Sequence, residues 1–364
     1  MSTLRILALE PYYGGSHRAV LDLLVAQIDA DWTVVSLPAR KWKWRMRGAA
    51  ITMAQEVQAL ADVVGAPAPW DLIFTSTFLN LAEFRGLCGT QVATIPAIVY
   101  FHENQLSYPN RHVAEWDLQF PLTNITTALA ADSCIFNTAW NKEQFLEQIP
   151  GFFRQFPDHH PAGVAELIAK KSSVLAPPFD PEPFDAVPPT RGPRCRIIWP
   201  HRWEHDKNPE EFFHAVMALA AEGLDFEVAV AGQSFRETAD LMRDAAAALG
   251  TRLVHCDEPK TKEQYVQLLS SSDVAVSTAS NEFFGLAMIE ACYAGCTPVV
   301  PDRLAYPEIY VPRYRYDGAD QLVARLRDLV LHRPAPGEAR LLAARFTATR
   351  LAPEYQTTFA AVAR

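Results

Sequence analysis

The feature that most constrains the fold is a repeated alternation of short apolar runs with longer, helix-like stretches. Most of the runs are almost continuously apolar, as expected for parallel strands that helices cover on both faces. The alternation therefore predicts a doubly wound α/β architecture. In chain order the runs are LRILAL, WTVVSLP, DLIFTST, AIVYFHE, SCIFNT, SSVLAPP, CRIIWPHR, FEVAVAGQ, RLVHCDE, DVAVST and TPVVPD.

The alternation is interrupted by the proline-rich stretch APPFDPEPFDAVPPTRGPR. Its seven prolines exclude a helix and indicate a linker. We expect a Rossmann-like domain on each side, with ligands bound beyond the carboxyl ends of the strands in a cleft between the domains. The predicted division is a first domain over 1–178, a linker over 179–193, a second domain over 194–335, and C-terminal helices over 336–364 that pack back toward the first domain.

Composition limits the classes of function. The formal net charge of -9 argues against a general nucleic-acid binder. No apolar run reaches the about 18 residues of a membrane span, so we expect a cytoplasmic protein. The six cysteines form no CxxC pair and are expected to be reduced core residues. The oligomeric state is left open.

Two cations follow the strand CRIIWPHR in the second half of the chain. Arg202 and Lys207 precede a predicted helix that starts near Asn208 and Pro209, since proline suits a first helical turn. Arginine binds a diphosphate through two parallel hydrogen bonds, and lysine binds it as a point charge. The pair predicts a diphosphate site, and a solvated charged loop is the alternative.

The stretch NEFFGLAMIEACYAG places two carboxylates around an otherwise apolar helix. We expect that helix to begin at Gly285 and run through Ala294, with Glu282 before its start and Glu290 inside it. The unpaired N–H groups of a helix start favour an anion, and a buried carboxylate needs hydrogen bonds. One carboxylate is therefore predicted to bind a sugar and the other a ribose, with phosphates on the helix end. The alternative for Glu290 is a hydrogen bond to neighbouring backbone.

Two loops after strands in the first half carry candidate ligand-binding residues. A glycine pair that ends at Gly15 allows close backbone approach to a ligand, and His17 follows it. A plain tight turn fits that stretch equally well. His102, Glu103 and Asn104 come directly after the strand AIVYF, which predicts a role in lining a cleft; a capped, hydrogen-bonded turn is the alternative.

A basic stretch with interleaved tryptophans, RKWKWRMR, spans residues 40–47. Cations attract phosphates, and indole rings stack on unpaired bases, so the stretch predicts contact with single-stranded RNA such as an anticodon loop. The alternatives are an exposed strand edge or an amphipathic patch that binds a membrane surface or nothing. The residues concerned are Arg40, Lys41, Trp42, Lys43, Trp44, Arg45 and Arg47.

Together these residues resemble the retaining glycosyltransferases of the family 4 type, which have the GT-B fold. Glu282 and Glu290 match the E-x7-E element, in which the first Glu contacts the donor sugar and the second the ribose. Arg202 and Lys207 match the diphosphate pair. The resemblance implies two Rossmann-like domains that face a cleft. The donor-binding residues expected from it are Gly15, Arg202, Lys207, Glu282, Phe284, Gly285, Leu286 and Glu290.

A narrower resemblance is to the tRNA-queuosine α-mannosyltransferase family. It is carried by EPYYGGSH, LPARKWKWRMR, TFLNLAEFRGL, YFHENQLSYP, FNTAWN, WPHRWEHDKNPE and NEFFGLAMIEA. It implies GDP-mannose as donor and the cyclopentenediol of queuosine in a tRNA anticodon as acceptor, with His17, Glu103, Asn104 and the basic stretch on the acceptor side. The alternatives are a glycosyltransferase for a lipid or polysaccharide, a non-catalytic nucleotide-sugar or RNA-binding module, and a nucleotide-sugar epimerase.

The resemblance also implies a mechanism. Arg202, Lys207 and the helix end would stabilise the leaving diphosphate, and Glu282 would orient the sugar. The leaving phosphate is thought to accept the acceptor's proton in this class, so His102 either positions the acceptor or acts as general base. The D-x-D triplet at Asp29–Asp31 lies at the wrong end of a strand for the cleft. We therefore expect chemistry without a metal or other cofactor.

Overall fold

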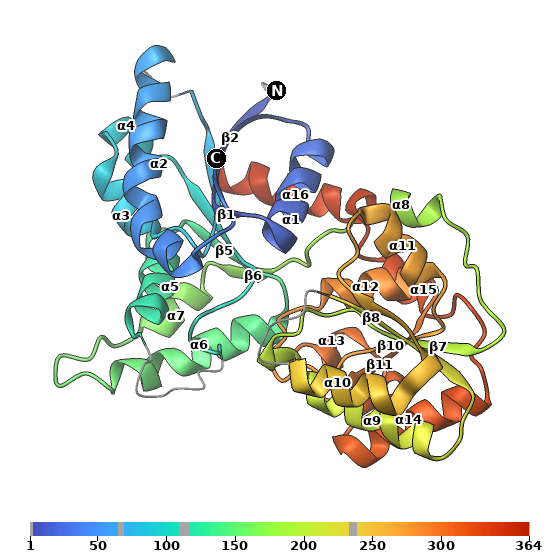
Figure 1. Cartoon of the computed structure of the whole chain (residues 1–364). Coiled ribbons are helices and arrows are strands. Elements are labelled where there is room, and N and C mark those ends of the chain that lie inside the picture. The colour runs from blue at the N-terminus through green and yellow to red at the C-terminus, as the bar shows by residue number, and fades with distance from the viewer. Residues whose placement is uncertain (1–2, 65–68, 109–116, 233–238, 364) are drawn as a thin grey trace. The chain divides into compact units, whose positions relative to one another are not determined.

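The chain folds into two compact units, each built on a six-stranded sheet (Figure 1). The first unit contains residues 1–178 and 348–364, and the second contains residues 179–347. All strand pairs within the two sheets are parallel, and helices connect them, which confirms the predicted α/β class. The computed structural model describes residues 3–64, 69–108, 117–232 and 239–363.

The first sheet has the strand order β2-β1-β3-β4-β5-β6. Ile6 of β1 pairs with Trp32 of β2 on one side and with Leu72 of β3 on the other. Every residue of β3 and β4 is buried, because helices cover both faces of these strands. The strands are β1 (Leu4–Tyr13), β2 (Ala30–Pro38), β3 (Leu72–Ser76), β4 (Ala97–Phe101), β5 (Ser133–Phe136) and β6 (Ser172–Val174).

The helices of the first unit include one, α16, that comes from the far end of the chain. The Tyr355 hydroxyl of α16 donates to the Ala176 carbonyl at 3.0 Å. The helices are α1 (Gly15–Gln27), α2 (Trp42–Val64), α3 (Leu81–Leu87), α4 (Thr90–Ala93), α5 (Gln119–Ala130), α6 (Ala139–Phe153), α7 (Val164–Ala169) and α16 (Ala348–Val362).

The second sheet has the strand order β12-β11-β10-β7-β8-β9. Its centre is apolar, and Trp199 at the end of β7 is fully buried. The strands are β7 (Cys195–Trp199), β8 (Phe226–Ala231), β9 (Leu253–Asp257), β10 (Val274–Val276), β11 (Thr297–Pro301) and β12 (Arg315–Tyr316).

The helices of the second unit include α12, which has Gly285 as its N-cap and Ala294 as its C-cap, as the sequence predicts. The α-helices are α8 (Glu182–Asp185), α9 (Pro209–Ala221), α10 (Ala239–Leu249), α11 (Lys262–Ser270), α12 (Leu286–Tyr293), α13 (Tyr306–Ile309), α14 (Gly318–Leu331) and α15 (Arg340–Ala344). Short 3-10 helices occur at His205–Lys207, Gly250–Arg252 and Pro312–Tyr314.

The domain boundaries differ from those predicted at two places. The segment over 179–193 belongs to the second unit, because Phe179 and Phe184 are buried there and contact Tyr293 edge to face. It also contains the one-turn helix α8, whose first turn tolerates proline. The predicted C-terminal segment over 336–364 is divided as well, since α15 stays in the second unit and α16 joins the first.

No helix within the described ranges is both long enough and apolar enough to cross a membrane.

Candidate functional site

In the first unit, polar side chains gather where β1, β3 and β4 end. Glu10, near the end of β1, is only 4% exposed. Its carboxylate accepts hydrogen bonds from the Tyr12 backbone N–H at 2.8 Å and from the Ser76 hydroxyl at 3.1 Å. A buried carboxylate requires such partners. Glu10 is therefore held in one orientation, with its other oxygen directed to His17.

His17 connects two carboxylates. Its Nδ1 lies 3.3 Å from Glu10 Oε2, and its Nε2 lies 3.4 Å from Glu103 Oε1. Burial opposes a charge on the ring, but the two carboxylates outweigh it and raise the pKa of His17 to about 10. His17 is thus an imidazolium at neutral pH and fixes the position of Glu103.

His102 stacks on His17, with ring centroids 4.1 Å apart. Burial and the charge of His17 together hold the pKa of His102 well below its usual value. His102 is therefore neutral at working pH and can accept or share a proton, whereas His17 cannot. Ring atoms of these two histidines and a Glu10 oxygen lie within 4.8 Å of one another. Both nitrogens of His17 already face carboxylates, so Glu10, His17 and Glu103 form an ion-pair chain on which the neutral His102 ring stacks.

The loop that carries His102 and Glu103 is fixed by buried amides. Asn137 donates to the His102 carbonyl at 2.7 Å, and Asn141 donates to the Phe101 carbonyl at 3.2 Å. Asn104, predicted to face the acceptor, is fully buried and donates to Asn141 at 2.7 Å. In this structure Asn104 supports the loop from inside.

The two glycines before α1 have different roles. A Cβ added to Gly14 would lie 2.4 Å from the Ala39 Cβ, so this position requires glycine for close packing. Gly15 has a positive φ of 53° and open space around it. The backbone of Gly15 is thus accessible, as its predicted contact with a donor requires.

The basic stretch forms the start of α2, with Arg40 and Lys41 before it, and its two tryptophans differ. Trp42 packs against Phe120 and Phe78, with ring centroids 5.0 Å and 6.5 Å away. The Trp44 side chain instead lies across Gly48 and is 63% exposed.

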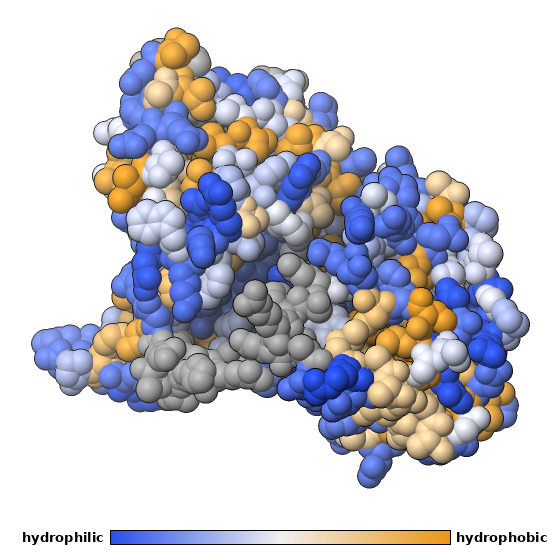
Figure 2. All heavy atoms as spheres, viewed as in Figure 1, coloured by the Kyte–Doolittle hydropathy of each residue, from blue (hydrophilic) through white to orange (hydrophobic). Residues whose placement is uncertain are grey.

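The cations of this stretch also differ. Arg47 forms an ion pair with Asp117. The Arg45 guanidinium donates to the Pro38 carbonyl at 3.1 Å. Arg40, Lys41 and Lys43 are exposed. Figure 2 shows hydrophobic surface over the other end of α2. Val63, in the last turn of that helix, is 87% exposed, so the helix has a basic end and an apolar end.

In the second unit, Lys207 and Glu282 meet. The Lys207 Nζ lies 3.2 Å from Glu282 Oε2, 3.2 Å from Asp206 Oδ2 and 2.9 Å from the Asn281 carbonyl. These three acceptors match the three N–H donors of an ammonium group. Burial acts against both charges, but the mutual attraction prevails: the pKa of Lys207 is raised and the pKa of Glu282 is lowered.

The start of α12 lies beside this ion pair. Glu282 Oε1 also accepts from the backbone N–H groups of Phe283 at 3.1 Å and Phe284 at 3.4 Å. Gly285 has a φ of 87°, and a Cβ there would lie 3.3 Å from the Tyr306 ring. The turn before α12 therefore requires glycine. The Phe284 side chain points inward and contacts Phe346, while Leu286 is half-buried.

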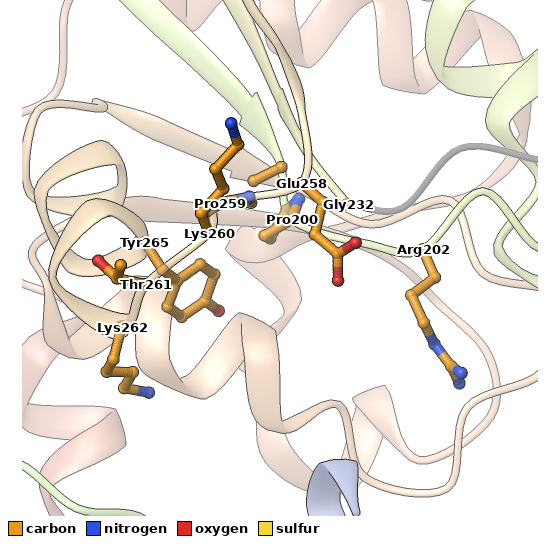
Figure 3. A pocket seen from close by; sticks show the side chains of 10 residues that line it. Pro200, Arg202, Gly232, Glu258, Pro259, Lys260, Thr261, Lys262 and Tyr265 are labelled. Atoms are coloured by element: carbon orange, nitrogen blue, oxygen red, sulfur yellow. The ribbon is translucent and has the colours of Figure 1, made fainter. Parts of the chain in front are cut away.

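Glu290 binds side chains of a neighbouring helix, α11, rather than backbone. Its carboxylate accepts from Lys262 Nζ at 2.6 Å and from the Tyr265 hydroxyl at 2.9 Å. These two residues line a pocket of about 420 Å³ beyond the ends of β7, β8 and β9. Figure 3 shows them on one side of that pocket and Arg202 on the other. The Arg202 side chain is 63% exposed and pairs with Glu204 at 3.2 Å, so it is accessible to a ligand.

Comparison with known proteins now places the chain. Residues 5–179 match the family model described as tRNA-queuosine alpha-mannosyltransferase N-terminal, and residues 184–334 match glycosyl transferases group 1. A tRNA-queuosine alpha-mannosyltransferase of Drosophila melanogaster is 36% identical over 334 residues, which cover 88% of this chain and 85% of the relative. The chain belongs to the tRNA-queuosine alpha-mannosyltransferase family. It is an enzyme, a glycosyltransferase that uses a nucleotide sugar.

Solved structures agree on the fold. HepE of Anabaena, in complex with UDP and glucose, is similar with a TM-score of 0.69 at 14% identity, over 98% of this chain and 100% of that one. Sucrose-phosphate synthase of Thermosynechococcus elongatus has a TM-score of 0.67 at 16% identity, over 98% and 100%. Both likenesses confirm the GT-B fold that the sequence predicts.

Several residues of these sites were not singled out from the sequence. Glu10 interrupts the apolar run of β1. A charged residue inside a buried strand needs hydrogen-bond partners, so the sequence alone could have indicated Glu10 as a site residue. The sequence pattern does not connect Lys262 and Tyr265 with Glu290, because they come from another helix, more than 20 residues earlier in the chain. Asn137 and Asn141 lie in the quoted stretch FNTAWN, but only the structure shows that they hold the histidine loop.

Proposed function

We propose that this glycosyltransferase moves mannose from GDP-mannose to the queuosine of a tRNA anticodon with retention of anomeric configuration. The observation that carries the proposal is its family membership, because that family is named for this acceptor and this sugar. The paired Lys207 and Glu282 beside a helix start support it, since they match what a charged sugar donor requires.

On the donor side, Arg202 is the accessible member of the Arg202 and Lys207 pair, because its side chain is 63% exposed. Lys207 is already bonded to three acceptors and would exchange one of them for a phosphate oxygen. Both charges and the N–H groups at the start of α12 would then stabilise the leaving diphosphate. Glu282 would orient the sugar, and Glu290, set by Lys262 and Tyr265, would accept from ribose hydroxyls.

On the acceptor side, the neutral His102 would position the attacking hydroxyl or take its proton. Glu103, held by His17, offers a carboxylate to the hydroxyls of the queuosine cyclopentenediol. Trp44 and the exposed cations at the start of α2 would contact the tRNA. Asp29 directly precedes β2, at the amino end of that strand, so we propose transfer without a metal. We also propose that the protein acts in the cytoplasm, as its proposed tRNA acceptor requires.

The decisive experiment incubates the purified protein with labelled nucleotide sugars and defined acceptors in the presence of excess chelator. We expect transfer from GDP-mannose to tRNA that carries queuosine, and none to the same tRNA without queuosine. A thermal-shift panel with GDP-, UDP- and ADP-sugars gives a second measurement, because a ligand at about 100 times its dissociation constant stabilises by about 2.7 kcal/mol. Transfer to a lipid acceptor instead would refute the tRNA assignment, and activity restored only by manganese would refute metal independence.

A further inference from the structure

A glycine inside α2 is not required by the backbone of that helix. Gly48 lies within α2, which spans 23 residues, and it does not have a positive φ. Glycine is among the least favourable residues for the interior of a helix. Alanine would therefore stabilise α2 at this position, unless another group already occupies the space of its methyl group.

The indole of Trp44 occupies that space. A Cβ added to Gly48 would lie 2.9 Å from Cζ2, 3.1 Å from Cη2 and 3.2 Å from Cε2 of Trp44. These three atoms are neighbours in the ring and are almost equally distant from the Cβ position, which an approach to the ring edge would not give. The Cβ position therefore lies over the face of the indole, and that face rests on the helix at Gly48.

The opposite face of the indole is open to solvent. Trp44 is 63% exposed, although Gly48 beneath it is buried. The ring thus gains little burial from its position, and its contact with Gly48 fixes its orientation. An indole that is held flat on a helix offers one π-face on which a planar group can stack.

The charges around Trp44 favour RNA as the source of that planar group. Arg40, Lys41 and Lys43 are exposed at the same end of α2. Cations bind the phosphates of a single strand whose bases stack on aromatic rings. An anionic membrane would also attract these cations, but a tryptophan that inserts into lipid projects from its helix, whereas Trp44 lies flat on α2.

We propose that Gly48 is a positioning residue for RNA binding: it seats the indole of Trp44 face-down on α2, so that the free face stacks on one unpaired base of the tRNA. Because the other face is covered, Trp44 can stack on one base but cannot insert between two. The inference rests on the proposed function, since it requires a tRNA acceptor with an accessible unpaired base.

The test uses opposite expected effects on binding and on stability. Gly48→Ala places a methyl group under the indole, which is exposed and can turn away at little cost. We expect the affinity for queuosine-bearing tRNA to fall about tenfold, because the ring no longer presents its face. The melting temperature should stay the same or rise, because alanine favours the helix. Gly86→Ala in α3 is the matched control for tRNA binding, since no described atom lies within 4 Å of a Cβ there.

Two further measurements separate positioning from a general structural effect. In a Trp44→Ala background, Gly48→Ala should cause no further loss of tRNA affinity, because Gly48 acts through the ring. The second measurement is the quenching of tryptophan fluorescence by tRNA. The part of it that Trp44 contributes, obtained as the difference between the wild type and Trp44→Phe, should be smaller in Gly48→Ala.

Three outcomes would overturn the inference. They are wild-type tRNA affinity in Gly48→Ala, an equal loss of affinity with and without Trp44, and a melting temperature of Gly48→Ala below that of the wild type, which would make Gly48 a packing residue. Binding to anionic vesicles that Gly48→Ala loses while it keeps its tRNA affinity would assign the ring to a membrane instead.

The failure of the inference and the failure of the proposed function give different results. A wild-type protein that binds tRNA and transfers mannose to it, while Gly48→Ala binds tRNA equally well, refutes the role of Gly48 alone. A wild-type protein that does not bind tRNA refutes the proposed acceptor and the inference with it.

Discussion

At the scale of single residues, the donor-side cations differ in how the protein holds them. Arg202 is exposed and pairs with the Glu204 carboxylate, whereas Lys207 is bonded to three acceptors inside the unit. The same substitution should therefore have different consequences at the two positions.

We predict that Arg202→Ala and Lys207→Ala each lower transfer at least about 100-fold, because each removes charge stabilisation of the leaving diphosphate. Only Lys207→Ala should also destabilise the fold, by about 3 kcal/mol, since it leaves Glu282 and Asp206 without their cation. Steady-state kinetics and urea unfolding separate the two effects. Wild-type rates in Lys207→Ala would remove it from the diphosphate site.

His17 gives a prediction for the dependence of stability on pH. Its pKa is raised to about 10 in the folded protein from an ordinary value of 6.5. A raised pKa contributes stability that is fully present below about 6.5 and is lost as pH rises through about 10. The stability difference between the wild type and His17→Gln should therefore shrink over this interval. A difference that stays constant up to pH 10.5 would show that His17 is not charged.

At the scale of secondary structure elements, α2 directs Trp42 and Trp44 to opposite sides, although both lie in the same basic stretch of sequence. Residues two apart on a helix are about 200° apart around its axis, so they face opposite sides. Trp42 consequently enters an aromatic cluster with Phe120 and Phe78, and Trp44 remains 63% exposed.

We predict that Trp44→Ala weakens tRNA binding by about 1–3 kcal/mol while thermal unfolding and GDP binding stay unchanged. Trp42→Ala should instead lower the melting temperature, because it removes a packed aromatic ring. Filter binding with queuosine-bearing tRNA and differential scanning calorimetry measure the two effects. If Trp44→Ala left tRNA affinity intact, stacking by this residue would be excluded.

The close approach of β8 to the loop after β7 is a second element-scale constraint. Gly232→Ala would place a Cβ 1.9 Å from the His201 carbonyl oxygen, so we expect a loss of about 3 kcal/mol or more and weaker donor binding. Gly192→Ala is the matched control, since nothing lies within 4 Å of a Cβ there. Calorimetric unfolding with and without GDP compares them, and equal melting temperatures would contradict the clash.

These cases show what the sequence can and cannot predict. The apolar runs predict the parallel strands, and the lone carboxylates around Gly285 correctly mark the start of α12. The partners of Glu290 could not be predicted, because Lys262 and Tyr265 meet it only through the packing of α11 against α12. To predict that Trp42 is packed and Trp44 exposed, one must know that this stretch is helical and which side of α2 faces the core. The mixed charge pattern of the stretch does not reveal this.

At the scale of the whole molecule, the chain closes its first unit with its last helix. Tyr355 and Phe359 of α16 are fully buried, and the Tyr355 hydroxyl donates to the Ala176 carbonyl at 3.0 Å. Gln356 accepts from the Asp29 backbone N–H at 3.0 Å, so α16 is tied to the loop before β2 as well. The second unit, by contrast, is continuous from 179 to 347.

This connectivity predicts that ending the chain after Thr347 damages the first unit and spares the second. The loss of two buried aromatic side chains alone costs several kcal/mol, which is comparable to the whole stability of a domain. We expect the first unit of the truncated protein to unfold at a lower temperature and tRNA binding to be lost. The second unit should still be stabilised by GDP against thermal unfolding. A chain that ends after Val362, without Ala363 and Arg364, is the matched control and should behave like the full protein. Intact tRNA binding after removal of α16 would show that the first unit folds without it, and loss of GDP binding would show that the two units depend on each other.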